Sequence, residues 1–128
     1  MIRCSWCRTL LSLPLLRRDV HEGGTRSMIR HRYYVGTVTQ DGRPVPAVSV
    51  DACADLLIKG YGGYSLFHAR RAWSDKGEIK REPSRVYECL EDGGDEIDVK
   101  GIARDLAQFA DQTTVLWTAE VVEGGFSA

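Results

Sequence analysis

The sequence lacks a long hydrophobic run and an excess of charge of one sign. A membrane-spanning helix needs about 20 apolar residues, and the N-terminal apolar stretch at positions 10–16 is interrupted by Ser12 and Pro14. The 17 basic and 18 acidic residues give a net charge of −1. This balance argues against a protein that coats nucleic acid or an acidic membrane. We therefore expect a cytoplasmic protein that has no membrane partner.

Motifs of metal binding and catalysis are also missing. Cys4 and Cys7 form a single C-x-x-C without a second pair of ligands, while Cys53 and Cys89 fall in apolar positions of a predicted helix and strand. The sequence has no H-x-x-x-H pair, no phosphate-binding glycine loop and no nucleophile elbow. We predict no cofactor and no metal site, and we expect Cys53 and Cys89 to be buried free thiols.

The first 27 residues differ from the rest of the chain. Five arginines stand against two acidic residues there, and no periodic apolar face is present. Glu22-Gly23-Gly24 precedes Met28, and a bacterial ribosome-binding sequence encodes these residues in this frame. We interpret residues 1–27 as an unstructured upstream extension, with translation starting at Met28 and residues 28–128 forming one domain. A signal or anchor segment and a functional arm are the alternatives.

The remaining chain alternates between strand and helix patterns. β-Branched and aromatic residues mark strands, apolar residues at i, i+3, i+4 and i+7 mark helices, and Gly77 suits a hairpin turn. Ser49 and Asp98 are candidate helix N-caps. We predict a strand at 31–40, a helix from Ser49 to about Gly60, hairpin arms at 64–73 and 79–90 joined by 74–78, a helix after Asp98 and a strand at 113–122.

This β-α-β-β-α-β order is typical of the ferredoxin-like α+β fold. Right-handed crossovers place both helices on one face of a four-stranded antiparallel sheet in the order 4-1-3-2. The residues expected between helices and sheet are Val50, Leu57, Val99, Ile102, Leu106 and Phe109. The opposite sheet face then carries apolar residues without cover, so we expect a homodimer with Trp117 or Tyr34 at its interface.

The hairpin carries a family resemblance. The run from Trp73 to Val86, W-S-D-K-G-E-I-K-R-E-P-S-R-V, resembles the signature of an uncharacterised family of small bacterial and phage ferredoxin-like domains. Tyr34-Val-Gly and Gln112-Thr-Thr-Val resemble two further pieces of that signature, whereas Arg70-Arg71-Ala72 replaces its usual glycine. By this resemblance the positions of interest are Trp73, Arg81, Glu82 and Ser84.

Basic and aromatic residues gather on the hairpin and the neighbouring strands. They make up a candidate binding surface, although the same charges can simply keep a projecting hairpin soluble and in register. The candidate binding residues are Tyr34, His68, Arg70, Arg71, Trp73, Arg81, Glu82, Ser84 and Tyr87.

No set of catalytic residues is recognisable, so we predict a small non-catalytic interaction protein, an accessory protein of a phage or mobile element. One alternative is a cofactor-independent enzyme with a sheet-face pocket around His68, lined by Tyr34 and Tyr87. Another is a single-stranded nucleic-acid binder. The second hairpin arm disfavours it, because its R-E-P-S-R-V-Y-E-C sequence has one aromatic residue where an RNA-binding strand has three.

Overall fold

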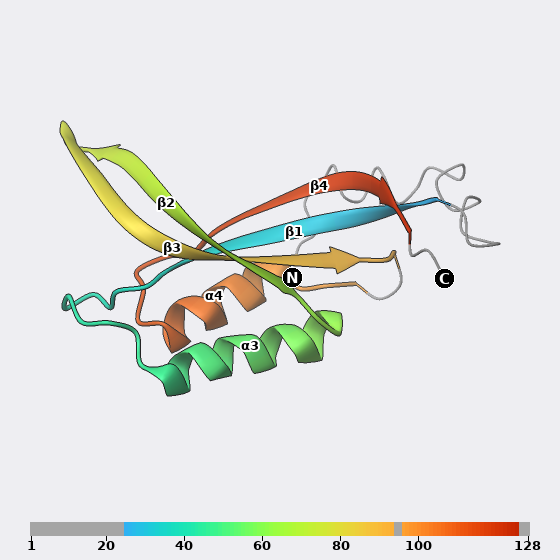
Figure 1. Ribbon diagram of the computed structural model, residues 1–128, viewed down its shortest axis with the longest axis horizontal. Helices are drawn as coiled ribbons and strands as arrows, with labels where there is room; N and C mark the ends of the chain where they lie inside the picture. The colour runs from blue at the N-terminus through green and yellow to red at the C-terminus, as the bar shows by residue number, and fades with distance from the viewer. Residues whose placement is uncertain (1–24, 94–95, 126–128) are drawn as a thin grey trace.

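The computed structural model describes residues 25–93 and 96–125. The four strands form one antiparallel sheet in the order β2-β3-β1-β4, and both helices cover the same face of it (Figure 1). This confirms the predicted ferredoxin-like α+β fold and its strand order. The elements are β1 (Arg26–Gly36), α3 (Ala47–Tyr61), β2 (Ser65–Asp75), β3 (Glu78–Glu91), α4 (Val99–Phe109) and β4 (Leu116–Gly124).

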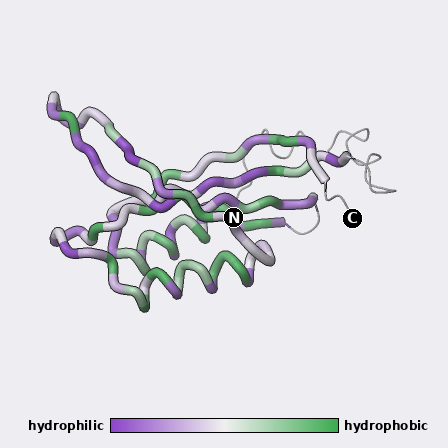
Figure 2. The backbone as a smooth tube through the Cα atoms, viewed as in Figure 1, coloured by the Kyte–Doolittle hydropathy of each residue, from purple (hydrophilic) through white to green (hydrophobic). Residues whose placement is uncertain are grey.

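The β2–β3 hairpin projects beyond the helices, with hydrophilic residues along both arms (Figures 1 and 2). Its strands pair as far as Asp75 opposite Glu78, so the turn has two residues rather than the predicted five. Lys76 and Gly77 both have positive φ, 53° and 85°. Two such residues form the type I′ turn, whose twist matches that of the flanking strands. The expected role of Gly77 is confirmed.

The ends of β1 differ from the prediction. The strand begins at Arg26, and Arg26 and Ser27 pair with β4, so these two residues of the predicted extension belong to the sheet. Residues 1–24 lie outside the described part of the chain. The strand ends at Gly36 because the following residues fold back, with a bridge between Val38 and Pro44 and a 2.9 Å hydrogen bond from the Val45 amide to the Thr37 carbonyl.

The helix boundaries follow their caps. The Asp98 side chain accepts a hydrogen bond from the Gly101 amide at 3.1 Å, as an N-cap does. Ser49 lies inside α3, which starts directly after Pro46, a residue whose fixed φ suits a helix entrance. Gly62 ends α3 in the left-handed conformation. Among the described residues no helix is long and apolar enough to cross a membrane.

The core lies between the sheet and the helices. Leu57 and Leu106 are fully buried there, and Val50, Val99 and Ile102 pack against the same cluster. Cys53 and Cys89 are buried free thiols, as predicted, and burial raises the pKa of these thiols to about 11 and about 12.

The placement of Phe109 in the core was wrong, because it is 40% exposed. The buried side of α4 runs through Ala103, Leu106, Ala107 and Ala110, one residue away from the stripe expected from the large side chains. Small alanine side chains let this helix approach its neighbours closely.

A hydrogen-bonded chain crosses the core from β1 to the end of α3. The Tyr33 and Tyr61 hydroxyls lie 2.5 Å apart, and the Tyr61 hydroxyl lies 3.0 Å from Nδ1 of the buried His31. Burial raises the pKa of both tyrosines above its usual range. These contacts satisfy polar atoms inside the core, so we assign this group to stability.

Leu106→Ala and Phe109→Ala form a matched pair of truncations on α4. Removing the fully buried Leu106 side chain should lower the free energy of unfolding by about 2–5 kcal/mol, because it leaves a cavity. Removing the exposed Phe109 ring should cost less than about 1 kcal/mol. Denaturant unfolding measures both values, and equal losses would contradict the position of α4 described above.

Candidate active site on the open sheet face

The sheet face that points away from the helices is called the open face below. On β1 it carries Arg30, Arg32, Tyr34 and Gly36, because alternate residues of a strand share a face. Their partners on β3 are, in the same order, Leu90, Glu88, Val86 and Ser84. Three of these eight residues are charged, whereas the homodimer prediction assumed an apolar surface. Trp117 lies on the other side, against the core. The homodimer stays a prediction.

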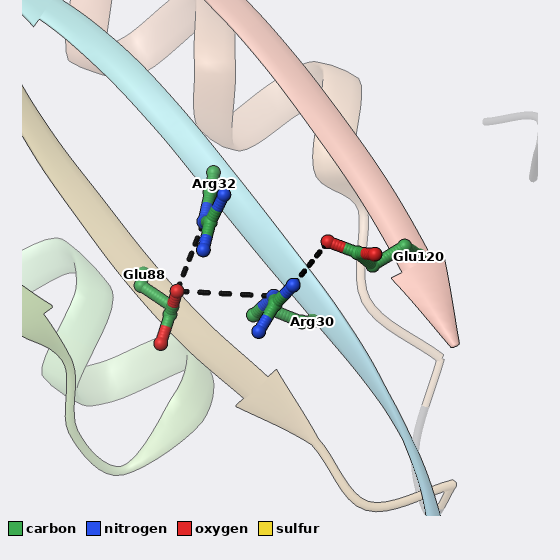
Figure 3. Close-up of polar contacts among 4 residues, drawn as sticks. All are labelled: Arg30, Arg32, Glu88 and Glu120. Atoms are coloured by element: carbon green, nitrogen blue, oxygen red, sulfur yellow. Dashed lines mark hydrogen bonds and ion pairs between the residues drawn. The ribbon is translucent and has the colours of Figure 1, made fainter. Parts of the chain in front are cut away.

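The charges at one end of the open face are paired with one another (Figure 3). Arg32 Nε donates to Glu88 Oε1 at 2.9 Å, Arg30 Nε lies 3.8 Å from the same oxygen, and Arg30 also binds Glu120. The hydrogen bond with Glu88 raises the pKa of Arg32, and the hydrogen bond from Arg30 lowers the pKa of Glu120. These side chains hold three neighbouring strands together and leave few charges for a ligand.

The other end of the open face is built around Gly36. A Cβ atom at this position would lie 2.7 Å from a carboxylate oxygen of Glu82 and closer still to the amide oxygen of Gln112. The Gln112 amide is fixed in orientation, because its Nε2 donates to the carbonyls of Val38 at 2.8 Å and Ala110 at 2.9 Å. Gly36 is thus the position where two side-chain oxygens from distant parts of the sequence come together.

Ser84 lies beside this group, opposite Gly36 on β1 and Ala69 on β2. These three small residues form a low area of the open face. The Ser84 side chain is only 1% exposed, and its hydroxyl has no hydrogen-bond partner within the described residues. An unpaired buried hydroxyl costs about 1–3 kcal/mol, so it marks a place where a partner would be stabilising.

Arg71 and Glu82 lie directly opposite each other on β2 and β3 but do not form an ion pair in the described structure. The Arg71 guanidinium instead lies 5.8 Å from the ring centre of Tyr34 and 5.3 Å from that of Trp73. Such cation–π contacts hold the cation in place. The Glu82 carboxylate has no hydrogen bond or ion pair with any described residue. A surface cavity of about 430 Å³ adjoins them, lined by Arg70, Arg71, Ala72, Arg81, Glu82 and Pro83.

Five of the nine predicted binding residues share the open face. Arg70 and Arg81 also line the cavity, but strand alternation places them on the opposite side of the hairpin from Arg71 and Glu82. The remaining two do not join them: Tyr87 is buried in the core against Tyr64, and His68 is exposed on the helix-facing side, opposite Arg85. The five on the open face are Tyr34, Arg71, Trp73, Glu82 and Ser84.

A pocket around His68 lined by both Tyr34 and Tyr87, as predicted, is therefore not formed by the described residues. Tyr34 and Tyr87 were expected to line it together, but they point to opposite faces because Tyr34 pairs with Val86. Trp73, the first residue of the hairpin signature, lies opposite Lys80.

Gly36 and Gln112 were not among the predicted site residues. Both had been noted in the sequence as parts of the two shorter motif pieces. The sequence could have pointed to them, because the two shorter motif pieces and the hairpin signature are parts of the same family signature, although they lie far apart in the chain.

A second cavity, of about 500 Å³, lies between α4 and the start of β4. Lys100, Arg104 and Gln108 line it on the helix side and Trp117 on the strand side, and Gln112 borders it as well. None of these charged side chains is buried. It therefore offers weaker grounds for a site than the Gly36 region.

Among solved structures, this chain is similar to a phage SAM lyase in complex with S-methyl-5′-thioadenosine. The match has a TM-score of 0.57 and 16% sequence identity, and it covers 77% of this chain and 90% of that one. No protein-family model and no curated protein matches the sequence. At this identity the match shows a shared fold.

The match nevertheless corrects the prediction of a non-catalytic interaction protein. The matched SAM lyase, which is covered over 90% of its own chain, is an enzyme. The absence of familiar catalytic motifs was therefore a poor reason to exclude catalysis, and the enzyme alternative is the better supported one.

Proposed function

We propose that this protein is a small enzyme that binds S-adenosylmethionine and cleaves it, releasing S-methyl-5′-thioadenosine. The observation that carries the proposal is the structural match to a SAM lyase that holds this nucleoside. A shared fold does not fix a function, so the proposal depends on whether the site around Gly36 suits the substrate.

The parts of S-adenosylmethionine have suitable partners in this region. The adenine ring can stack on Tyr34 or Trp73, an interaction of about 1–3 kcal/mol per base. The substrate carboxylate suits the arginines of the adjoining cavity, none of which is ion-paired within the described chain, because a guanidinium binds a carboxylate through two parallel hydrogen bonds. The positive charges of the substrate suit the unpaired carboxylate of Glu82.

The reaction itself requires little from the protein. The bond between the sulfonium sulfur and the γ-carbon of the methionine part breaks, and its electron pair neutralises the sulfur. As that bond breaks, the γ-carbon bonds either to the substrate's own carboxylate oxygen, which closes a lactone, or by a double bond to the β-carbon, whose proton passes to the solvent. Neither route consumes water or a second substrate. Positioning alone can contribute much of such a rate enhancement, which explains how an enzyme of this kind can lack a recognisable catalytic motif.

The homodimer, the cytoplasmic location, the phage or mobile-element origin and the assignment of residues 1–27 to an upstream extension stay predictions. They are compatible with the proposed activity but do not support it.

Incubation of the purified chain with S-adenosylmethionine should release S-methyl-5′-thioadenosine faster than a heat-denatured sample does. Arg71→Ala should slow this release by about 10-fold to 100-fold, since a hydrogen bond to a charged group contributes about 1.5–3 kcal/mol. Arg43→Ala is the matched control, because Arg43 is an exposed loop residue that pairs with Asp41. Liquid chromatography with mass spectrometry measures the product, and release no faster than in the denatured sample would refute the proposed activity.

Gly36→Ala should slow product release by about 100-fold while the protein stays folded, because the new methyl group takes the space of the Glu82 and Gln112 oxygens. The backbone at Gly36 does not have a positive φ, so alanine fits it. Gly63→Ala is the matched control, since its added Cβ meets no atom within 4 Å. Circular dichroism checks the fold of both variants. Equal activity of both would place the reaction away from Gly36.

A further inference from the structure

Two hydrogen-bond acceptors meet at Gly36 without a donor between them. The Glu82 oxygen and the Gln112 amide oxygen both lie within 3 Å of the position that a Cβ of Gly36 would take. The Gln112 amide cannot turn its NH₂ group towards Glu82 without giving up its bonds to Val38 and Ala110. Acceptors repel each other, so this arrangement is stabilised by a ligand that brings hydrogen-bond donors and positive charge.

Resting on the proposed function, we infer that Glu82 and Gln112 bind the α-ammonium group of the substrate and so select its amino-acid end. S-Adenosylmethionine has two positive groups, but its sulfonium carries no hydrogen on the sulfur. Its ammonium carries three N–H donors, and only this group can donate to both oxygens at once. Ser84 pairs with Gly36 in the sheet and its buried hydroxyl has no partner among the described residues, so it is available to accept the third hydrogen.

Other partners for these acceptors fit less well. Arg71 is the nearest cation in the strand register, but its guanidinium is held over the rings of Tyr34 and Trp73. A divalent metal ion takes six or more oxygen ligands, usually with several carboxylates, and no group of three or more His, Cys, Asp and Glu side chains suited to a metal occurs in the described part of the chain. A proton shared between Glu82 and Gln112 is the remaining alternative. The Glu82→Gln variant would mimic the protonated carboxyl group.

Two nucleosides that cannot undergo the cleavage separate these possibilities. S-Adenosylhomocysteine keeps the ammonium and lacks the sulfonium charge, whereas S-methyl-5′-thioadenosine lacks the whole amino-acid end. Calorimetric titration of the full chain should show that Glu82→Gln weakens binding of S-adenosylhomocysteine by about 10-fold to 100-fold and changes binding of S-methyl-5′-thioadenosine by less than about twofold. Glu78→Gln is the matched control, because Glu78 lies at the hairpin tip and pairs with Lys80.

Nuclear magnetic resonance gives a second readout that needs no substitution. The Gln112 side-chain amide and the Gly36 backbone amide should shift on addition of S-adenosylhomocysteine and should not shift with S-methyl-5′-thioadenosine. An unchanged affinity for S-adenosylhomocysteine in Glu82→Gln, or an equal loss for both nucleosides, would overturn the inference while S-adenosylmethionine cleavage by the wild type still stood. Failure of wild-type protein to bind S-adenosylhomocysteine would overturn the inference, and failure to cleave S-adenosylmethionine as well would overturn the proposed function with it.

Discussion

The pairing register of β1 with β3 is the constraint on which the rest of the structure depends. It sets Tyr33 opposite Tyr87 on the helix side and Gly36 opposite Ser84 on the open side. A shift of one residue would exchange the two faces, placing Arg32 in the core and exposing Tyr33. The buried chain from Tyr33 through Tyr61 to His31 adds a polar restraint that only this register satisfies. One pairing therefore determines both the core and the candidate site.

The open face separates charges that support the sheet from charges that are available to a ligand. Arg30, Arg32, Glu88 and Glu120 form ion pairs with one another across three strands. Glu82 and Arg71 lie in an equally good cross-strand position, yet they stay unpaired among the described residues. The Glu82 carboxylate does not pair with the adjacent Arg71 guanidinium, and the Ser84 hydroxyl nearby in the sheet is buried without a partner among the described residues. Unpaired polar groups of this kind are typical of a ligand-binding surface.

The fold could be predicted from local patterns because each element carries its own signal. Asp98 caps α4 and Gly77 closes the hairpin where the sequence indicates. Phe109 was misplaced because helical periodicity favours large side chains, whereas the buried stripe of α4 uses alanines. The site was predictable only in part. Glu82 and Ser84 lie in the hairpin signature, but their meeting with Gly36 and Gln112 depends on strand order and register. The same dependence removed Tyr87 and His68 from the site, since their face follows from the partner strand.

The central claim is that the region around Gly36 on the open face binds the substrate of an S-adenosylmethionine-cleaving enzyme. A crystal structure of the full chain with S-adenosylhomocysteine tests it most directly. We expect the nucleoside on the open face, with its ammonium between Glu82 and Gln112 and its adenine against Tyr34 or Trp73. A nucleoside in the cavity between α4 and β4, or on the helix-covered side near His68, would contradict it.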